Sequence, residues 1–214
     1  MEHLKRKNKI KNNRYSILIM IGIYFIFLGS SYLIYNQYNN KKQDSINDEL
    51  IEDYFKVEDE IIETPQKEIE EEKPVSKEKI DYIAVLEIPK IKLKRGIVDK
   101  NSSYNNVNRN IYTLKETTMP DEKDNSHIML ASHSGNSYIS FFKNLKKLDM
   151  KDKINFYYKG VKYIYEVSNR YEIEKTGTTD LKITNKSDIT LITCISGTNK
   201  QVVYVGNLVD KENY

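Results

Sequence analysis

The segment DITLITCISGT, residues Asp188 to Thr198, joins an apolar, β-branched run to a short loop containing Ser196 and Gly197. β-Branched and apolar residues in runs of this length are typical of a buried β-strand. Cys194 ends the predicted strand Ile189–Cys194 and stands directly before the loop. It is the only cysteine of the chain, which excludes an intramolecular disulfide framework and a cysteine-rich zinc site.

Similar short runs fill the rest of the C-terminal part. The other predicted strands are Tyr82–Ile88, Lys92–Val98, Ser126–Ser132, Lys153–Tyr158, Lys162–Tyr171 and Gln201–Leu208. Apolar residues at helical spacing between Ser140 and Leu148 predict one short helix. Many short strands with turn signals and one or two short helices predict a mainly β fold, an antiparallel or mixed barrel.

The N-terminal part has a different composition. Residues 1–14 hold six basic residues against one acidic residue, and residues 15–35 (YSILIMIGIYFIFLGSSYLIY) carry no charge. A helix of about 20 apolar residues spans a bilayer, and a basic flank favours the cytoplasmic side. These features predict a cytoplasmic basic tail (1–14), a single transmembrane helix (15–35) in the cell membrane and an extracellular remainder. A cleaved signal peptide is the alternative, but the apolar run is longer than such peptides need.

An acidic segment separates the anchor from the strands. Residues 44–72 contain 13 acidic and two basic residues and no glycine. Such a composition buries little apolar surface and extends by self-repulsion, so residues 36–79 are predicted to form a flexible extracellular stalk. A short helix around Ile46 to Phe55 is compatible with this prediction and would not change the function. Residues 80–214 have the size of one domain. The net charge of the chain is only +3, which predicts no nucleic-acid partner.

Cys194 has two interpretations. A lone cysteine is often a small buried hydrophobe, whereas a nucleophile needs a thiolate and a basic partner. Its position at a strand-to-loop transition favours the nucleophile. His133 is the best candidate partner, because it too follows an apolar strand, in IMLASHSG. His127 lies within the strand pattern and is expected to be structural.

At these residues the chain resembles the sortase family. TLITC, residues Thr190–Cys194, resembles the sortase signature, and SHSG around His133 resembles the segment around the catalytic histidine. The separation of 61 residues between His133 and Cys194 suits that family, as does YIAVLEIPKI from Tyr82 onward. The resemblance covers residues 82 to 209.

The resemblance implies an eight-stranded sortase β-barrel and a cysteine transpeptidase of Gram-positive bacteria. Its substrates would be secreted proteins with an LPxTG-like C-terminal sorting signal, cut between Thr and Gly. An amine from a peptidoglycan precursor or a pilin would then accept the protein. By match, Cys194 is the nucleophile, His133 is the general acid/base, and Thr193 helps to shape the oxyanion site. No cofactor is implied.

One expected residue is missing. Sortases usually have an Arg opening the strand after the cysteine, but here Gln201 occupies that position, with Lys200 beside it. Unlike arginine, Gln201 can donate a hydrogen bond but carries no charge. Lys200 carries a charge but lacks the planar guanidinium group with its parallel N–H donors. Losing one oxyanion donor typically costs ~10²–10³ in rate. Three options follow: the enzyme is slow, it uses Lys200 or Gln201 in place of the arginine, or it recruits Arg170 from another strand, which is the weakest of the three.

Two alternatives to a catalytic sortase stay open. A degenerate sortase-like module would bind sorting motifs with little catalysis, and a membrane-anchored structural protein would keep an inert core cysteine.

The short segments Thr176–Ser187 and Ile195–Lys200, and the lack of a lid motif, indicate a class A- or D-like sortase. Some sortases bind calcium through acidic loops, so the acidic residues between Glu116 and Asp124 are either a calcium site or, as their spacing favours, a solvated loop. The acidic residues concerned are Glu116, Asp121, Glu122 and Asp124.

Overall fold

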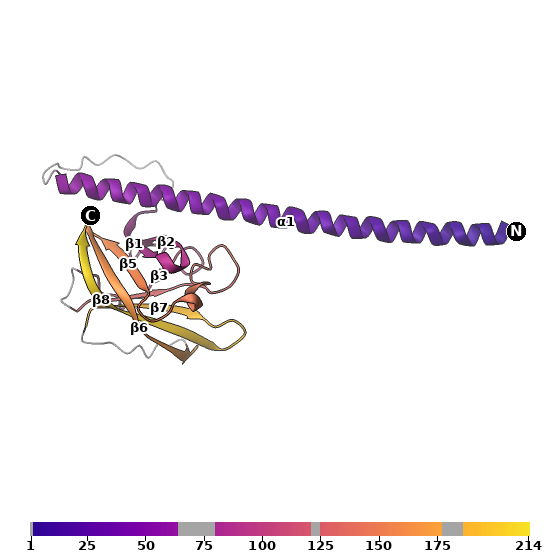
Figure 1. Cartoon of the computed structure of the whole chain (residues 1–214). Coiled ribbons are helices and arrows are strands. Elements are labelled where there is room, and N and C mark those ends of the chain that lie inside the picture. The colour runs from indigo at the N-terminus through magenta and orange to yellow at the C-terminus, as the bar shows by residue number, and fades with distance from the viewer. Residues whose placement is uncertain (1, 64–79, 121–124, 177–185) are drawn as a thin grey trace. The chain divides into compact units, whose positions relative to one another are not determined.

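The computed structural model describes residues 2–63, 80–120, 125–176 and 186–214, and within the N-terminal helix it describes side chains from residue 15 to residue 58. The chain divides into two compact units, Met1–Ile46 and Asn47–Tyr214. The first unit is helical, and the second contains every described strand (Figure 1).

The elements follow one another in a simple order. In chain order they are α1 (Glu2–Glu63), β1 (Tyr82–Ile88), the 3-10 turn η1 (Pro89–Ile91), β2 (Leu93–Val98), β3 (Tyr112–Thr113), β4 (His127–Ala131), the 3-10 turn η2 (Leu145–Lys147), β5 (Lys153–Tyr158), β6 (Val161–Glu174), β7 (Asp188–Cys194) and β8 (Lys200–Asn213). The predicted mainly β fold is confirmed, and seven of the eight strands lie where the sequence patterns predict them. The exception is β3, whose two residues are too short to leave a pattern.

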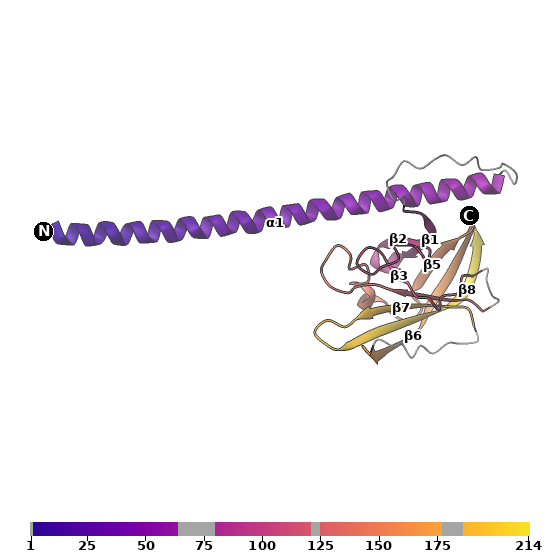
Figure 2. The ribbon, with the colours of Figure 1, turned by 180° about the vertical axis from the view of Figure 1, so that it is seen from behind.

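The eight strands form one sheet in the order β2-β1-β5-β6-β8-β7-β4-β3. All pairs are antiparallel except β4 with β7, which run parallel. The sheet curves around a common interior and forms a nearly closed eight-stranded barrel (Figures 1 and 2). The parallel pair of β4 and β7 matters most for the candidate site, because it brings the C-terminal ends of two strands that are far apart in the sequence next to each other.

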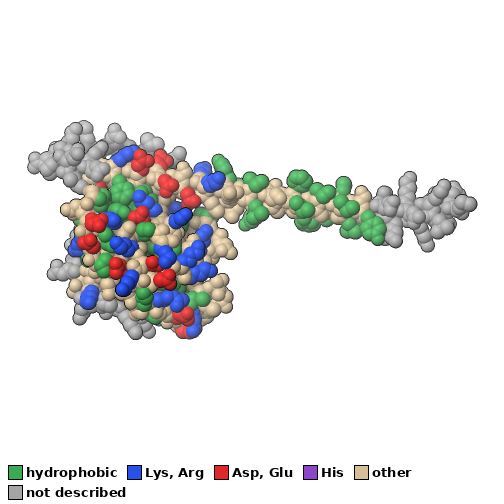
Figure 3. All heavy atoms as spheres, in the orientation of Figure 1, with side chains coloured by type: hydrophobic (Ala, Val, Ile, Leu, Met, Phe, Trp, Pro, Cys, Tyr) green, Lys and Arg blue, Asp and Glu red, His purple; other side chains and the backbone are tan. Residues whose placement is uncertain are grey.

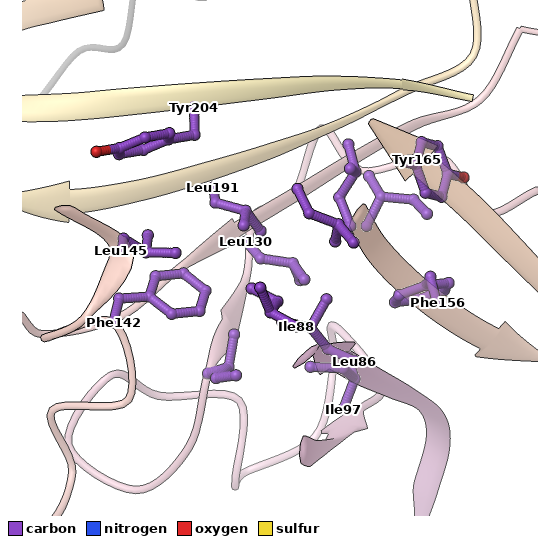
Figure 4. Packing of buried hydrophobic residues seen from close by; sticks show 14 of the residues in the cluster. Leu86, Ile88, Ile97, Leu130, Phe142, Leu145, Phe156, Tyr165, Leu191 and Tyr204 are labelled. Carbon is purple, nitrogen blue, oxygen red and sulfur yellow. The ribbon is translucent and has the colours of Figure 1, made fainter. Parts of the chain in front are cut away.

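The main core fills this interior. Side chains from β1, β2, β4, β5, β6, β7 and β8 point toward one another there, among them Leu86, Leu130, Phe156, Leu191 and Tyr204 (Figure 4). Burial of this apolar surface is the principal force that holds the barrel.

The short helix predicted between Ser140 and Leu148 is present only in part, as the 3-10 helix η2. The segment forms turns and only the 3-10 turn η2, although its apolar residues Phe142, Leu145 and Leu148 are buried in the main core as their pattern indicates. Contacts with the barrel interior satisfy these side chains without a full helical turn, so apolar spacing alone does not fix the local conformation.

The helix α1 carries the uncharged run of residues 15–35. Within the described residues it is the one helix long and apolar enough to cross a membrane, with large apolar side chains exposed along that run (Figure 3). Such exposure is unfavourable in water and favourable in hydrocarbon. The length and composition of the helix thus fit a membrane anchor.

The last part of α1 belongs to the barrel unit. Ile51 is only 4% exposed, and the Phe55 ring meets the edges of Tyr157 and Tyr214 at 5.3 and 5.2 Å between centroids. Glu58 accepts a hydrogen bond from the Tyr214 hydroxyl. Burial raises the pKa of Tyr214, and this hydrogen bond raises it further, so the phenol stays protonated and able to donate. Residues 47–58 are hereafter called the docked segment.

Asn47 fixes the beginning of the docked segment. Its Oδ1 accepts from the Gly96 N–H at 3.3 Å and from the Tyr82 hydroxyl at 3.4 Å, while its Nδ2 donates to the Lys94 carbonyl at 3.3 Å. Gly96 is required beside it, since a Cβ atom there would lie 2.0 Å from the Tyr82 ring. The docked segment therefore has a polar attachment to β1 and β2 through Asn47, and an aromatic attachment to β5 and the C-terminal Tyr214 through Phe55.

The predicted flexible stalk differs from the structure over its first part. Residues 36–63 are helical, the compact unit begins at Asn47 instead of residue 80, and residues 64–79 lie outside the described residues. The short helix allowed around Ile46 to Phe55 is part of α1, but its docking was not predicted; Ile51 and Phe55 are four positions apart and therefore share one helix face. That pair supplies the apolar edge that the prediction took to be absent.

Docking of this segment predicts a stability effect. Ile51→Ala should lower the free energy of unfolding of the barrel unit by about 2 kcal/mol, because it removes buried methylene groups. For a unit of this size that corresponds to a melting temperature lower by roughly 4–8 °C. The measurement is near-ultraviolet circular dichroism of the full chain in detergent during heating. Val57→Ala, at an exposed position of the same helix, is the matched control and should change little; equal melting of both variants would show that the segment does not dock.

Candidate active site

The parallel pair of β4 and β7 brings two strand ends together. His127 is the register partner of Asp188 and Ala131 is that of Ile192, a constant offset of 61 residues. The same offset separates His133 from Cys194, the residues that follow β4 and end β7.

Two hydrogen bonds extend this register beyond the end of β4. The Ser132 N–H donates to the Ile192 carbonyl at 3.2 Å, and the Thr193 hydroxyl donates to the Ser132 carbonyl at 2.7 Å. Thr193 is buried, so its hydroxyl holds the two strands together. His133 and Cys194 are the next residues on these two tied chains.

A buried polar pair locks the other end of the same two strands. His127 Nδ1 lies 2.9 Å from Asp188 Oδ1, and Asp188 is only 3% exposed. His127 is therefore structural, as its place in the strand pattern predicts. The side-chain bond fixes β4 against β7 at one end, as Thr193 does at the other.

Strand alternation divides the side chains of β7 and β8 between two faces. Leu191 and Tyr204 belong to the main core, whereas Ile192, Val203 and Val205 form a second apolar cluster. Leu114, Ala131, Tyr171 and Ile173 pack against it. Successive side chains of a strand point to opposite faces, so Cys194 lies on the face of this second cluster, two residues after Ile192. The Cys194 side chain is half-buried and its thiol is free.

His133 is also half-buried and has one side-chain partner among the described residues. Its Nε2 lies 3.2 Å from Asn108 Oδ1. Its backbone carbonyl accepts a hydrogen bond from the Phe142 N–H at 3.1 Å, and Phe142 is in the main core. The loop after β4 is thereby anchored to the interior at the catalytic candidate itself.

A tight turn connects Cys194 to β8. The Ile195 N–H donates to the Lys200 carbonyl at 2.9 Å, and the Thr198 hydroxyl donates to the Ile195 carbonyl at 3.0 Å. Gly197 has φ +77°, a left-handed conformation that favours glycine. The turn makes Gln201 the register partner of Cys194 across the β7–β8 pair.

The basic candidates near this site have other partners. Lys200 Nζ lies 3.7 Å from Glu172 Oε2, and alternation puts Lys200 on the opposite face of β8 from Gln201. Arg170 Nε donates to the Tyr204 hydroxyl at 3.1 Å, and Tyr204 belongs to the main core. Of the three candidates, Gln201 alone shares the face of Cys194.

Two contacts of the site escape sequence reasoning. Asn108 belongs to a polar stretch that reads only as a loop, and nothing in its pattern points to His133. Thr193 comes from the sequence only as a neighbour of Cys194, and nothing in its pattern points to the hydrogen bond of its hydroxyl with the Ser132 carbonyl. Local pattern does not reveal which loop or carbonyl a polar side chain meets.

The acidic residues of the calcium alternative lie mostly outside the described residues. Glu116 is exposed, while Asp121, Glu122 and Asp124 lie outside the described residues. Among the residues that the structure does describe, no three His, Cys, Asp or Glu side chains gather closely enough to hold a metal ion.

Comparison with known proteins agrees with this architecture. The family model "Sortase domain" matches residues 86–209. Sortase A of Bacillus anthracis is 26% identical over 215 residues, covering 92% of this chain and 97% of that protein. Among solved structures, Listeria monocytogenes sortase A has a TM-score of 0.53 at 22% identity, over 62% of this chain and 90% of that one. The Clostridium perfringens sortase D5 transpeptidase has a TM-score of 0.52 at 23% identity, over 61% and 80% of the two chains.

The structural likenesses are distant in sequence and establish the fold. The family match covers more than half of the chain and includes β4, β7 and most of β8, the strands that carry the candidate site. A nearly closed eight-stranded barrel, a long apolar N-terminal helix and this family match lead to one conclusion: the chain belongs to the sortase family of transpeptidases.

Proposed function

We propose that this sortase is a membrane-anchored cysteine transpeptidase that cleaves an LPxTG-like C-terminal sorting signal of secreted proteins. The observation that carries the proposal is the parallel register of β4 and β7, which puts His133 and Cys194 at matching positions on adjacent strand ends. Cysteine acyl transfer requires a thiol and an imidazole that can approach one another, and neighbouring strand ends support such an approach.

The reaction proceeds through a thioester. The Cys194 thiolate attacks the carbonyl carbon of the Thr–Gly bond, the C–N bond breaks, and His133 gives its proton to the departing glycine amine. An amine of a peptidoglycan precursor or a pilin then attacks the thioester, His133 takes the proton of that amine, and the Cys194 thiolate leaves. Backbone N–H groups near Cys194, helped by Gln201 or Lys200, hold the oxyanion.

The second apolar cluster supports an apolar element in the recognised peptide. Ile192 lies two positions before Cys194 on β7, and Val203 lies two positions after Gln201 on β8. The second apolar cluster therefore continues the sheet face on which Cys194 lies. Ile192 and Val203 are themselves buried, so an apolar side chain such as Leu or Pro of an LPxTG-like motif would meet the partly exposed residues packed around them, among them Ala131 and Tyr171.

A sorting-signal peptide with a fluorophore and quencher on either side of its Thr–Gly bond tests the proposal. The full chain in detergent should release fluorescence, and mass spectrometry of the intact protein should find the peptide's acyl group on Cys194. Addition of an oligoglycine amine should give a transpeptidation product. Peptide binding without acyl-enzyme would instead favour the degenerate module that the missing Arg suggests. Neither binding nor acylation would favour the inert structural protein.

Membrane topology is part of the proposal. The basic residues 1–14 support a cytoplasmic N-terminus, and the apolar run 15–35 of α1 supports a single crossing with the barrel outside the cell. Because Cys194 is the only cysteine, a membrane-impermeant maleimide reports on a single site. Labelling in intact cells is expected; labelling only after lysis would place the barrel in the cytoplasm.

Gln201 is the better supported oxyanion donor, which gives a prediction. Gln201→Ala should lower kcat by ~10²-fold, since an oxyanion donor acts mainly in the transition state. Lys200→Ala should change kcat less than about two-fold, because Lys200 lies near Glu172 on the other face and its exposed ion pair contributes little. Steady-state kinetics with the quenched peptide measure both. The reverse order of effects would transfer the role to Lys200.

A further inference from the structure

The side chain of Asn108 reaches the candidate general acid/base. Its Oδ1 lies 3.2 Å from His133 Nε2, and a carbonyl oxygen is only an acceptor, so Nε2 is the donor. Nδ1 of His133 is thereby left as the nitrogen that exchanges a proton. Asn108 itself is exposed, and among the described contacts its side chain bonds to His133 alone.

The loop that carries Asn108 is tied down by other asparagines. Asn105 bonds to both backbone groups of Thr113, accepting its N–H at 2.7 Å and donating to its carbonyl at 2.9 Å. The Asn105 side-chain amide thus bonds to the Thr113 backbone as a neighbouring strand would, and this attaches the loop to β3. The loop is therefore fixed to the barrel before the chain reaches Asn108.

Further bonds fix the backbone on either side of Asn108. Asn106 Oδ1 accepts the Asn108 N–H at 2.8 Å, and the Asn106 carbonyl accepts the Arg109 and Asn110 N–H groups at 2.9 and 2.8 Å. Asn110 Nδ2 donates to the Gly96 carbonyl of β2 at 3.2 Å. With the backbone held in this way, the Asn108 amide needs no structural role of its own and is presented to the imidazole.

We propose that Asn108 is a positioning residue, which orients the His133 ring and fixes its proton on Nε2. The proposal rests on the proposed transpeptidase function. An oriented ring is required twice in that reaction, once to protonate the leaving amine and once to deprotonate the incoming one. The Asn108 carbonyl also accepts from the imidazolium that exists before the first of these steps and again after the second, and hydrogen bonds to charged groups are the stronger ones.

The Asn108→Ala variant of the full chain tests the proposal kinetically. We expect kcat to fall about 10-fold with KM changed less than about two-fold, as loss of one hydrogen bond to a charged group predicts. Asn108→Asp, which keeps an acceptor, should recover most of kcat. It should also move the pH optimum of kcat upward, since a carboxylate stabilises the imidazolium. Asn101→Ala, an exposed residue of the same loop of which only the backbone N–H is hydrogen-bonded, should match the unaltered protein.

A spectroscopic measurement separates orientation from folding. In protein labelled with ¹⁵N-histidine, His133 of the unaltered chain should show a protonated Nε2 in its neutral form, and Asn108→Ala should broaden or shift that signal while the His127 signals stay unchanged. An unchanged kcat, or an unchanged His133 signal, in Asn108→Ala would overturn the proposal. The signal needs no substrate, so it remains informative even if the chain fails to form an acyl-enzyme, which would refute only the transpeptidase function.

Discussion

Cys194→Ala is expected to abolish cleavage of a sorting-signal peptide, with kcat reduced by at least ~10⁴-fold, because no other group in the chain offers a thiolate. His133→Ala should cost ~10³–10⁴-fold, since the thiol then lacks a proton acceptor and the leaving amine lacks a donor. Steady-state kinetics of the full chain in detergent measure both losses. Intact-mass analysis should show no acyl-enzyme in the first variant.

The double variant sharpens this test. Residues that act as a unit are strongly non-additive, so Cys194→Ala with His133→Ala should be no slower than Cys194→Ala alone. Met150→Ala, an exposed change away from the β4 and β7 ends, is the control and should keep full activity. Full turnover by either single variant would remove that residue from the mechanism.

Asp188→Ala is expected to have the largest effect on stability among polar substitutions, about 3 kcal/mol in the free energy of unfolding. Asp188 is buried with its Oδ1 2.9 Å from His127 Nδ1, and removing one partner of a buried pair leaves the other uncompensated. The melting temperature should fall by roughly 6–12 °C for a unit of this size. Thermal unfolding of the full chain, followed by near-ultraviolet circular dichroism, measures the change.

Asp188→Asn is the matched control for that change. Asparagine has nearly the same shape and keeps an oxygen that accepts a hydrogen bond, so it should lose clearly less stability than Asp188→Ala. Because the pair fixes the register of β4 against β7, the alanine variant should also show reduced kcat below its melting temperature. Equal stability of the alanine variant and the unaltered chain would contradict a structural role for the pair.

Much of the barrel follows from local pattern. Runs such as Ser126–Ser132 and Ile189–Cys194 are apolar and β-branched, and they appear as β4 and β7 within a residue of their predicted ends. The short β3 and the turns around η2 do not follow, because two residues carry no periodicity and buried apolar residues need no helix. The docked segment was also missed, since two apolar residues among many acids are a weak signal until the barrel surface that receives them is known.

The candidate site shows the same division. The sequence by itself determined that Cys194 and His133 each stand where an apolar strand ends, and that Gln201 replaces an expected arginine. Only the tertiary structure decided that the two strands pair in parallel with a constant offset, that Lys200 faces away from Gln201, and that Asn108 meets His133. Apolar alternation records burial at each position, which is a local property. Pairing partners and loop contacts depend on residues far apart in the chain, and these are fixed only when the sheet closes.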